Sequence, residues 1–359
     1  MSAHRITPVP AAARKPSAWP PASFWKTFGS HILIPLFLAA GMALAYLGAF
    51  HAAQPSNIPI GIVGEGPAAQ VFAQTLNDKA PDALDVRTVA TVKQAEQKVA
   101  DGTISAAYAT DASHATIILS TASSPAEASA AEELLLPIAY QQHLPVSVDD
   151  VRPVTADDMT GQGLFFLMVA MSVGGYSSAI AIAAVTARLG IGWRIAVSAA
   201  TAVVVSAIGV VVAGPLFHVL TGNEWSIGLL GALYTFGIIT IGVGLHPMLG
   251  RWTTPALTLL FVMLNVTTSG GIFPTDMMPP FFAGLSTFWT GAAWLDAARA
   301  LTYLPGQSFG FDGLRLALWA TAGLALIGIS HLLTLRRRQA ADDSLAATAE
   351  EEETATVAA

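Results

Sequence analysis

The sequence predicts an α-helical polytopic membrane protein with six transmembrane helices and an extracytoplasmic α/β domain inserted between helices 1 and 2. Of its 359 residues, 53% are hydrophobic and only 11% are charged, and the mean hydropathy is +0.56. Soluble domains usually carry about a quarter charged residues. The apolar residues gather into runs of about 20, the length that spans a bilayer. One stretch, residues 51–161, is far more polar than the rest, and we expect it to fold outside the membrane.

Six segments are apolar enough, and long enough or nearly so, to be transmembrane helices: 29–50, 163–186, 195–217, 226–248, 255–272 and 314–335. The last five form a predicted five-helix membrane domain at 162–335. The first follows basic residues and therefore has some character of a signal peptide. Its apolar run at 32–50 exceeds the usual signal-peptide core of about 7–15 residues, so we interpret 29–50 as an uncleaved anchor.

The basic residues near span ends predict the orientation, because Lys and Arg there stay on the cytoplasmic side. With six spans drawn, these residues all fall on one side: Arg5, Arg14, Lys15, Lys26, Arg188, Arg194, Arg251, Arg336, Arg337 and Arg338. On the opposite side, the segment 221–225 has no basic residue and 273–313 has Arg299 alone. Both termini are therefore expected to be cytoplasmic.

The two ends of the chain are predicted to be cytoplasmic tails, at 1–28 and 336–359. The first is rich in Pro and Ala, and its last part runs into "SFWKTFGSHILIP" at 23–35. That stretch predicts either a short amphipathic helix in the membrane interface or the ordinary aromatic belt of the first span. The final twenty residues are acidic and rich in alanine, a composition that favours disorder.

The polar stretch at 51–161 shows strands alternating with helices, a pattern that predicts a small α/β layer fold. Short apolar or alternating runs predict strands, and longer runs with apolar residues on one side predict helices. The expected strands lie at 58–64, 84–90, 105–110, 115–121 and 148–154. The expected helices lie at 68–80, 92–102 and 126–143.

Two patterns in this domain suggest chemistry, each beside a simpler structural interpretation. "GEGPAA" at 64–69 follows a strand, opens a helix and has Asp85 further on, as in a dinucleotide-binding turn. Pro67 removes an N–H that a pyrophosphate would use, and glycines at such turns are commonly structural. Four carboxylates before the second span have the oxygen ligands that calcium prefers: Asp149, Asp150, Asp157 and Asp158. Their spacing lacks the D-x-D-x-D-G loop of a calcium site, so we interpret them as a solvated acidic collar.

The sequence shows no pattern typical of cysteine chemistry or of a metal site. The chain has no cysteine, which excludes disulfides, thiolate metal sites and a cysteine nucleophile. Histidines lie mainly at span ends and lack the spacing of metal ligands. A Walker G-x-x-x-x-G-K-[ST] motif does not occur. We therefore predict that the chain is not an enzyme, holds no cofactor and binds no nucleic acid.

The second to fifth spans carry essentially no ionisable residues. Such residues would mark a proton or ion path, because an unpaired charge in hydrocarbon is costly. The same spans carry many small residues, as in "GGYSSAIAIAA" at 174–184. Small residues let helices pack closely, and a lining for an amphipathic substrate is the other interpretation.

One polar segment interrupts the apolar pattern at the end of the fifth span. "NVTTSGGIFP" at 265–274 is followed by "MP" at 278–279, "LSTFW" at 285–289 and "GAAWLDAARAL" at 291–301. This arrangement resembles the C-terminal part of type-2 ABC exporter permeases, and among them the YhgE/Pip (phage infection protein) group. The layout of one span, a large outer domain and five further spans is also similar to that group and covers nearly the whole chain.

The resemblance implies a permease in the bacterial plasma membrane that works with a separate ABC ATPase as a homodimer or heterodimer. In such permeases the fifth span ends outside, and the next helical stretch dips back into the membrane. Here that re-entrant hairpin would occupy 273–304, where Asp296 and Arg299 are spaced closely enough to pair on a helix. A non-helical break at membrane depth is tolerated where it faces protein or a cavity.

Two functions follow as expectations. The first is the membrane subunit of an exporter that moves a lipophilic or cell-envelope substrate outward past a gate at the break. The gate candidates are Asn265, Ser269, Gly270, Gly271, Phe273 and Pro274. The alternative is a membrane-anchored surface or assembly protein whose outer domain binds a partner, as a phage receptor does, without transport. Asn265 also begins a glycosylation sequon, which we discount because it falls within a predicted span.

Overall fold

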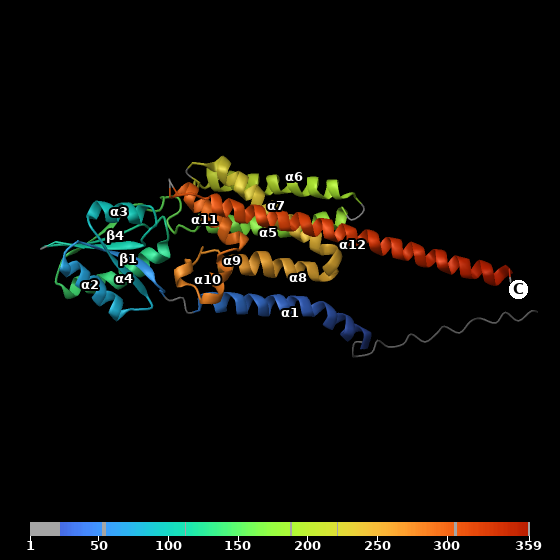
Figure 1. The fold of residues 1–359 in the computed structure, drawn as a ribbon, viewed down its shortest axis with the longest axis horizontal. Coiled ribbons are helices and arrows are strands. Elements are labelled where there is room, and N and C mark those ends of the chain that lie inside the picture. Colours follow the sequence, from blue (N-terminus) through green and yellow to red (C-terminus); the bar gives the residue numbers. More distant parts are fainter. Residues whose placement is uncertain are drawn as a thin grey trace, which may run out of the picture.

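The computed structural model describes residues 22–51, 55–111, 113–186, 189–220, 222–304 and 307–357. An α/β layer lies at one end of the molecule, and a bundle of long helices extends from it (Figure 1). The last helix, α12 (Gly310–Val357), runs past the far end of the bundle, away from the α/β layer (Figure 1).

The α/β layer contains the strands and helices that the sequence predicts. The strands are β1 (Ile58–Val63), β2 (Leu84–Val89), β3 (Ala106–Thr110), β4 (Ala115–Leu119) and β5 (Val146–Asp150). The helices are α2 (Pro67–Lys79), α3 (Val92–Ala100) and α4 (Pro125–Gln141). The sheet order is β2-β1-β3-β4-β5, parallel except for the antiparallel pair β3 and β4.

The sheet has a separate hydrophobic core on each face. One core packs residues of α2 and α4 against β1, β3 and β4, and includes Leu76, Tyr108 and Leu135. The other packs α3 through Ala95 and Val99. Both faces are therefore covered, as the strands' nearly continuous apolar character requires.

Side-chain caps fix where two of these helices begin. Gln94 N–H donates to the Thr91 hydroxyl at 3.2 Å, and the Gln94 side chain accepts from the N–H of Ala90. At α4, Glu127 N–H donates to the Ser124 hydroxyl at 3.3 Å, followed by proline at the first helical position. The Ser-x-x-Glu spacing of a capping box thus places Glu127 in the first turn of α4.

Five helical runs are long and apolar enough to cross a membrane by length and composition: Ile32–Phe50, Gly163–Val185, Ile191–Leu216, Glu224–Thr268 and Gly310–Ser344. They correspond to helices α1 (Ala22–Phe50), α5 (Gly163–Val185), α6 (Ile191–Val211) with a π-helical turn (Val212–Leu216), α7 (Glu224–Leu249) with α8 (Thr253–Thr258) and α9 (Leu264–Thr268), and α12.

The longest run folds back on itself at Gly250. This residue has φ 53° and ψ −120°, a conformation that glycine adopts far more readily than residues with a Cβ. A 3-10 turn (Gly250–Trp252) follows, and a π-helical turn (Leu259–Met263) joins α8 to α9. The run therefore consists of two antiparallel limbs, α7 and α8 to α9 (Figure 1).

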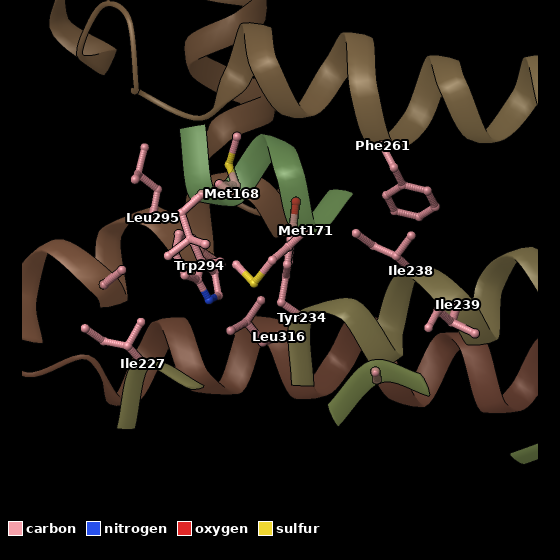
Figure 2. Packing of buried hydrophobic residues seen from close by; sticks show 14 of the residues in the cluster. Met168, Met171, Ile227, Tyr234, Ile238, Ile239, Phe261, Trp294, Leu295 and Leu316 are labelled. Atoms are coloured by element: carbon pink, nitrogen blue, oxygen red, sulfur yellow. The ribbon is translucent and has the colours of Figure 1, made fainter. Parts of the chain in front are cut away.

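Helix α7 is the centre of the bundle and packs closely through glycine. A Cβ on Gly244 would lie 2.8 Å from the backbone nitrogen of Ile327 in α12, and one on Gly242 would lie 2.5 Å from Ala179 Cβ in α5. Met168 and Met171 of α5 and Trp294 belong to the same hydrophobic core (Figure 2). The small residues thus serve helix packing.

Two short helices connect α9 to α12. After a 3-10 turn (Thr275–Met277), α10 (Pro280–Ser286) and α11 (Thr290–Thr302) follow. Nine residues of α11 are buried, against α5, α7, α9 and α12. The segment predicted at 273–304 is thus a helical hairpin at the end of the bundle nearest the α/β layer (Figure 1).

The tails differ from prediction where the structure describes them. The C-terminal segment is helical through Val357 as a continuation of α12, so the prediction of an unstructured end was wrong. Helix α1 is continuous from Ala22, with Pro35 inside it, so 23–35 is part of the long helix and does not form a separate short one. The tail at 1–21 lies outside the described residues.

Candidate functional site

The hairpin and the α/β layer are joined by direct contacts on several sides. Ser56 N–H donates to the Asp276 carbonyl at 2.7 Å, and Arg152 Nη1 donates to the Tyr303 carbonyl at 2.6 Å. Met277, 8% exposed, lies in the core of the α/β layer. The α/β layer is therefore anchored to the hairpin by direct contacts.

A polar cavity of about 290 Å³ lies at this junction. The α/β layer contributes Glu127 and several serine hydroxyls, and the helical hairpin contributes Asp296 and Arg299. The end of the fifth predicted span completes it. Five of the residues singled out from the sequence line this cavity: Ser269, Gly270, Pro274, Asp296 and Arg299.

A second cavity of about 320 Å³ adjoins the first and shares Ser124, Gly270 and Arg299 with it. Gly271 and Phe273 line this second cavity. Every predicted site residue except Asn265 therefore borders one of two neighbouring cavities between the α/β layer and the bundle. The sequence does not reveal this arrangement, because about half of the residues that line the first cavity belong to the α/β layer, which is far from the hairpin in the sequence.

The break after α9 has a specific local structure. Ser269 Oγ donates to the Val266 carbonyl at 3.2 Å and accepts from Gly271 N–H at 3.1 Å. Gly270 has φ 75°, a left-handed conformation that favours glycine. A Cβ on Gly271 would lie 2.1 Å from Cδ2 of Phe165. Serine closes the turn, the first glycine allows its backbone angle, and the second allows close contact with α5.

Asn265 lies apart from both cavities, in a buried polar cluster of the bundle. Its Nδ2 donates to the Tyr234 hydroxyl at 2.8 Å and lies 3.3 Å from Ser172 Oγ. Its Oδ1 accepts from Gly291 N–H at 3.1 Å. Asn265 is fully buried and thus ties α5, α7, α9 and α11 together. A buried side chain with these partners is unsuited to glycosylation, as the sequence analysis expects.

The predicted ion pair is replaced by another. Asp296 pairs with Arg315 of α12, Oδ2 to Nη1, at 3.5 Å. Arg315 also pairs with Asp312 at 2.8 Å. In the described ranges Arg299 has no ion pair, and no hydrogen bond of its guanidinium to another residue is formed. Spacing on one helix made Arg299 the expected partner, but the fold brings α12 closer to the carboxylate.

Three charged groups nevertheless influence one another across the first cavity. Burial lowers the pKa of Arg299, and the nearby charges of Asp296 and Glu127 oppose this effect. Burial raises the pKa of Glu127, while the Ser105 hydroxyl and Arg299 act in the other direction and Asp276 adds to the rise. The cavity thus holds one cation and two acids that stand beyond direct pairing distance from that cation.

Burial raises the pKa of Asp296 to about 6, with Asp312 adding to the rise and both Arg299 and Arg315 opposing it. The Asp296 side chain nevertheless keeps 49% of its surface accessible. Solvent therefore reaches this carboxylate from the cavity that it lines.

The raised pKa predicts the effect of Asp296→Asn on stability. A carboxyl whose pKa is higher in the folded state stabilises the fold below its unfolded pKa near 3.8, and that contribution is lost as pH rises through about 6. We expect Asp296→Asn to raise the unfolding temperature above pH 7 and to leave it unchanged near pH 4. Thermal unfolding of the purified protein across this range measures it, with the exposed Asp82→Asn as the control. A variant less stable than wild type above pH 7 would contradict it.

Two of the four acidic residues before α5 have structural roles, while Asp149 and Asp157 are exposed. Asp158, 7% exposed, accepts from Gln162 N–H at 3.2 Å and Gly163 N–H at 3.0 Å and so caps the start of α5. Asp150 accepts from the Thr121 hydroxyl at 2.5 Å. The collar interpretation was therefore wrong for these two, and no group of three metal-ligating side chains occurs in the part of the chain that the structure describes.

The glycine pattern at 64–69 forms the turn from β1 to α2. Gly66 is the N-cap of α2 and Pro67 its first residue, while Gly64 has φ 142°. Asp85, the residue expected at a ribose, pairs with Arg87 at 2.6 Å. These roles are those of the structural interpretation.

Comparison with family models, curated proteins and solved structures returned no match. The first cavity offers a cation, two acids and a set of serine hydroxyls, which are groups that recognise a polar ligand of mixed charge. Glu127 was missed from the sequence, although the Ser124-x-x-Glu127 capping pattern was a readable signal for its place in a helix.

Proposed function

We propose that this chain is the membrane subunit of a type-2 ABC-like exporter that moves a lipophilic or cell-envelope substrate outward. The observation that carries the proposal is the polar cavity where the break after α9, the helical hairpin and the α/β layer meet. A bundle that exports through this end would release its substrate past Ser269 and Gly270 into that cavity.

The bundle's surface supports placement in a bilayer. Large apolar side chains are exposed along the helices, as on a lipid-facing surface, among them Phe166, Val203, Ile208, Leu229 and Leu332. In the proposal the two limbs on either side of Gly250 cross separately, which gives six spans in a bacterial plasma membrane with both termini cytoplasmic. The α/β layer then lies outside and the extension of α12 lies inside.

The proposed energy source is a separate ATPase. The helices α5 and α8 to α9 carry no Asp, Glu, Lys, Arg or His, and α6 and α7 carry such residues near their ends, as Arg194, Glu224 and His246. A proton relay needs carboxylates or histidines along the path, so coupling to a proton gradient has no support in the bundle. The subunit would act without catalysing a covalent reaction itself, as a homodimer or heterodimer.

Purification of the tagged full-length chain from its native membranes tests the proposal. We expect a P-loop ATPase to co-elute, and we expect loss of the chain to reduce export of an envelope lipid or tolerance to a lipophilic drug. Cysteine labelling provides the orientation control, because the chain has no cysteine of its own. Ser113→Cys should react with an impermeant maleimide in intact cells, and Ala341→Cys only after the cells are opened.

The contrary outcome is also specific. Absence of an ATPase together with unchanged export and drug tolerance would overturn the exporter assignment. Recovery of an extracellular protein bound to the α/β layer under the same conditions would instead favour the surface or assembly function.

A further inference from the structure

The packing of the hairpin does not explain why an arginine lies at position 299. Its guanidinium carries five N–H donors and borders both cavities. Among the residues that the structure describes it forms no side-chain hydrogen bond or ion pair. A largely enclosed cation left without partners is unfavourable. Its surroundings are therefore more consistent with a group that arrives from outside than with a purely structural role.

The two acids of the first cavity do not supply the missing partner. Glu127 and Asp296 lie beyond ion-pair distance from Arg299 but close enough to affect its pKa. Asp296 is directed to Arg315 of α12. Arg299, Glu127 and Asp296 therefore border a common space of about 290 Å³ without pairing with one another.

The signs of the three charges limit the class of ligand that the cavity can bind. A simple anion would gain from Arg299 but be repelled by Glu127 and Asp296, and a simple cation would meet the reverse. A molecule with both charges matches all three groups, as electrostatic complementarity requires. The volume lies at the lower end of ligand pockets, which span about 300–1,000 Å³, and therefore suits a head group more than a whole lipid.

We propose that this cavity binds a small zwitterion in which an ammonium group and an anionic oxygen group lie a few bonds apart, as in phosphoethanolamine. The anionic group is held by Arg299, where planar forked donors suit phosphate and carboxylate. The ammonium group lies toward Glu127 and Asp296, and serine hydroxyls such as Ser123 and Ser269 complete the lining.

The inference rests on the proposed function only in taking this ligand as the substrate, since binding does not require transport. The same chemistry has two sources, a soluble molecule and the head group of a phospholipid in the outer leaflet. The cavity lies at the end of the bundle, where the proposed orientation places lipid head groups, so both sources can reach it.

Calorimetric titration of the full-length protein in phosphatidylglycerol nanodiscs, whose head groups carry no ammonium group, tests the binding site. The probes are phosphoethanolamine, inorganic phosphate and ethanolamine. We expect phosphoethanolamine to bind at least roughly tenfold more tightly than either fragment, a difference of about 1.4 kcal/mol. Equal affinity for the three probes, or absence of binding by all of them, would overturn the proposal.

Substitutions at 299 and 127 test which residue binds which end of the ligand. Arg299→Gln should reduce phosphoethanolamine affinity to the level of ethanolamine, and Glu127→Gln should weaken phosphoethanolamine but not phosphate. Glutamine at 127 preserves the capping-box pattern at the start of α4. The matched controls are Arg87→Gln and Glu133→Gln. They remove exposed charges from the α/β layer and should leave the affinity for phosphoethanolamine unchanged. Variants at 299 and 127 that bind like wild type would contradict the assignment.

Separate controls test whether the Arg299 variant folds and whether the ligand is a soluble molecule or a lipid head group. If Arg299→Gln does not fold, Arg299→Lys keeps the charge but loses the fork, and an affinity equal to wild type would then count against the proposal. Nanodiscs containing phosphatidylethanolamine should lower the apparent affinity for soluble phosphoethanolamine if the lipid is the source, and leave it unchanged if the source is soluble. Binding without a co-eluting ATPase would retain this site and refute the exporter, and export without zwitterion binding would do the reverse.

Discussion

Replacing Arg315 with glutamine should lower the stability of the helix bundle by about 3–5 kcal/mol, the usual effect of removing one partner from a buried ion pair. Arg315 is 8% exposed and pairs with Asp312 at 2.8 Å and Asp296 at 3.5 Å. Its Nη2 also donates to the carbonyls of Ser286 and Trp289. One side chain thus joins α10, α11 and the start of α12, and its loss leaves two carboxylates without their cation.

Unfolding of the purified protein in detergent, by heat or denaturant, measures the change. Arg336→Gln removes an exposed arginine from the same helix and should alter stability by no more than about 0.5 kcal/mol. Arg315→Lys should fall between the two, since it restores a charge without the planar fork. Equal stability of Arg315→Gln and Arg336→Gln would show that the buried cluster does not hold the hairpin.

The parts of the fold that local sequence controls were predictable. Each strand and helix of the α/β layer follows from alternation or helical spacing, and α4 begins at a capping pattern centred on Ser124. The long apolar runs follow from composition alone. Gly250 was not singled out as a turn, although the charge of neighbouring Arg251 already placed a loop between two spans.

The C-terminal segment shows a signal that was misjudged. After Gly328 the chain contains neither Gly nor Pro, and Ala and Glu favour helix. Helix α12 therefore continues through Val357, although acidic composition suggested disorder. Absence of a helix breaker outweighed charge in this segment.

The candidate site was half predictable for a physical reason. The Ser-Gly-Gly break is encoded locally, by a serine that closes a turn and a glycine with φ 75°. Glu127 reaches the same cavity only because the α/β layer docks on the hairpin, through contacts such as Arg152 to Tyr303. The pairing of Asp296 with Arg315 likewise depends on the packing of α11 against α12, which no spacing rule on one helix contains.

Among the glycines of the site, adding a methyl group at Gly271, as in Gly271→Ala, should destabilise the protein most. Its Cβ would lie 2.1 Å from Cδ2 and 2.6 Å from Cγ of Phe165, and Phe165 is only 5% exposed in the core of the bundle. The ring has little room to move, so we expect a loss of about 1–3 kcal/mol from overpacking. Thermal or denaturant unfolding in detergent measures it.

A neighbouring glycine and a second-site change separate overpacking from a general sensitivity of the hairpin. Gly284 lies in α10 with no atom within 4 Å of an added Cβ, so Gly284→Ala should be neutral or stabilising by up to about 1 kcal/mol, the helix preference of alanine over glycine. Phe165→Leu should partly rescue Gly271→Ala, with a coupling of about 0.5–3 kcal/mol, because the two side chains would occupy the same space. Strict additivity of the two changes would show that the close approach of Gly271 to Phe165 is not what fixes the break after α9.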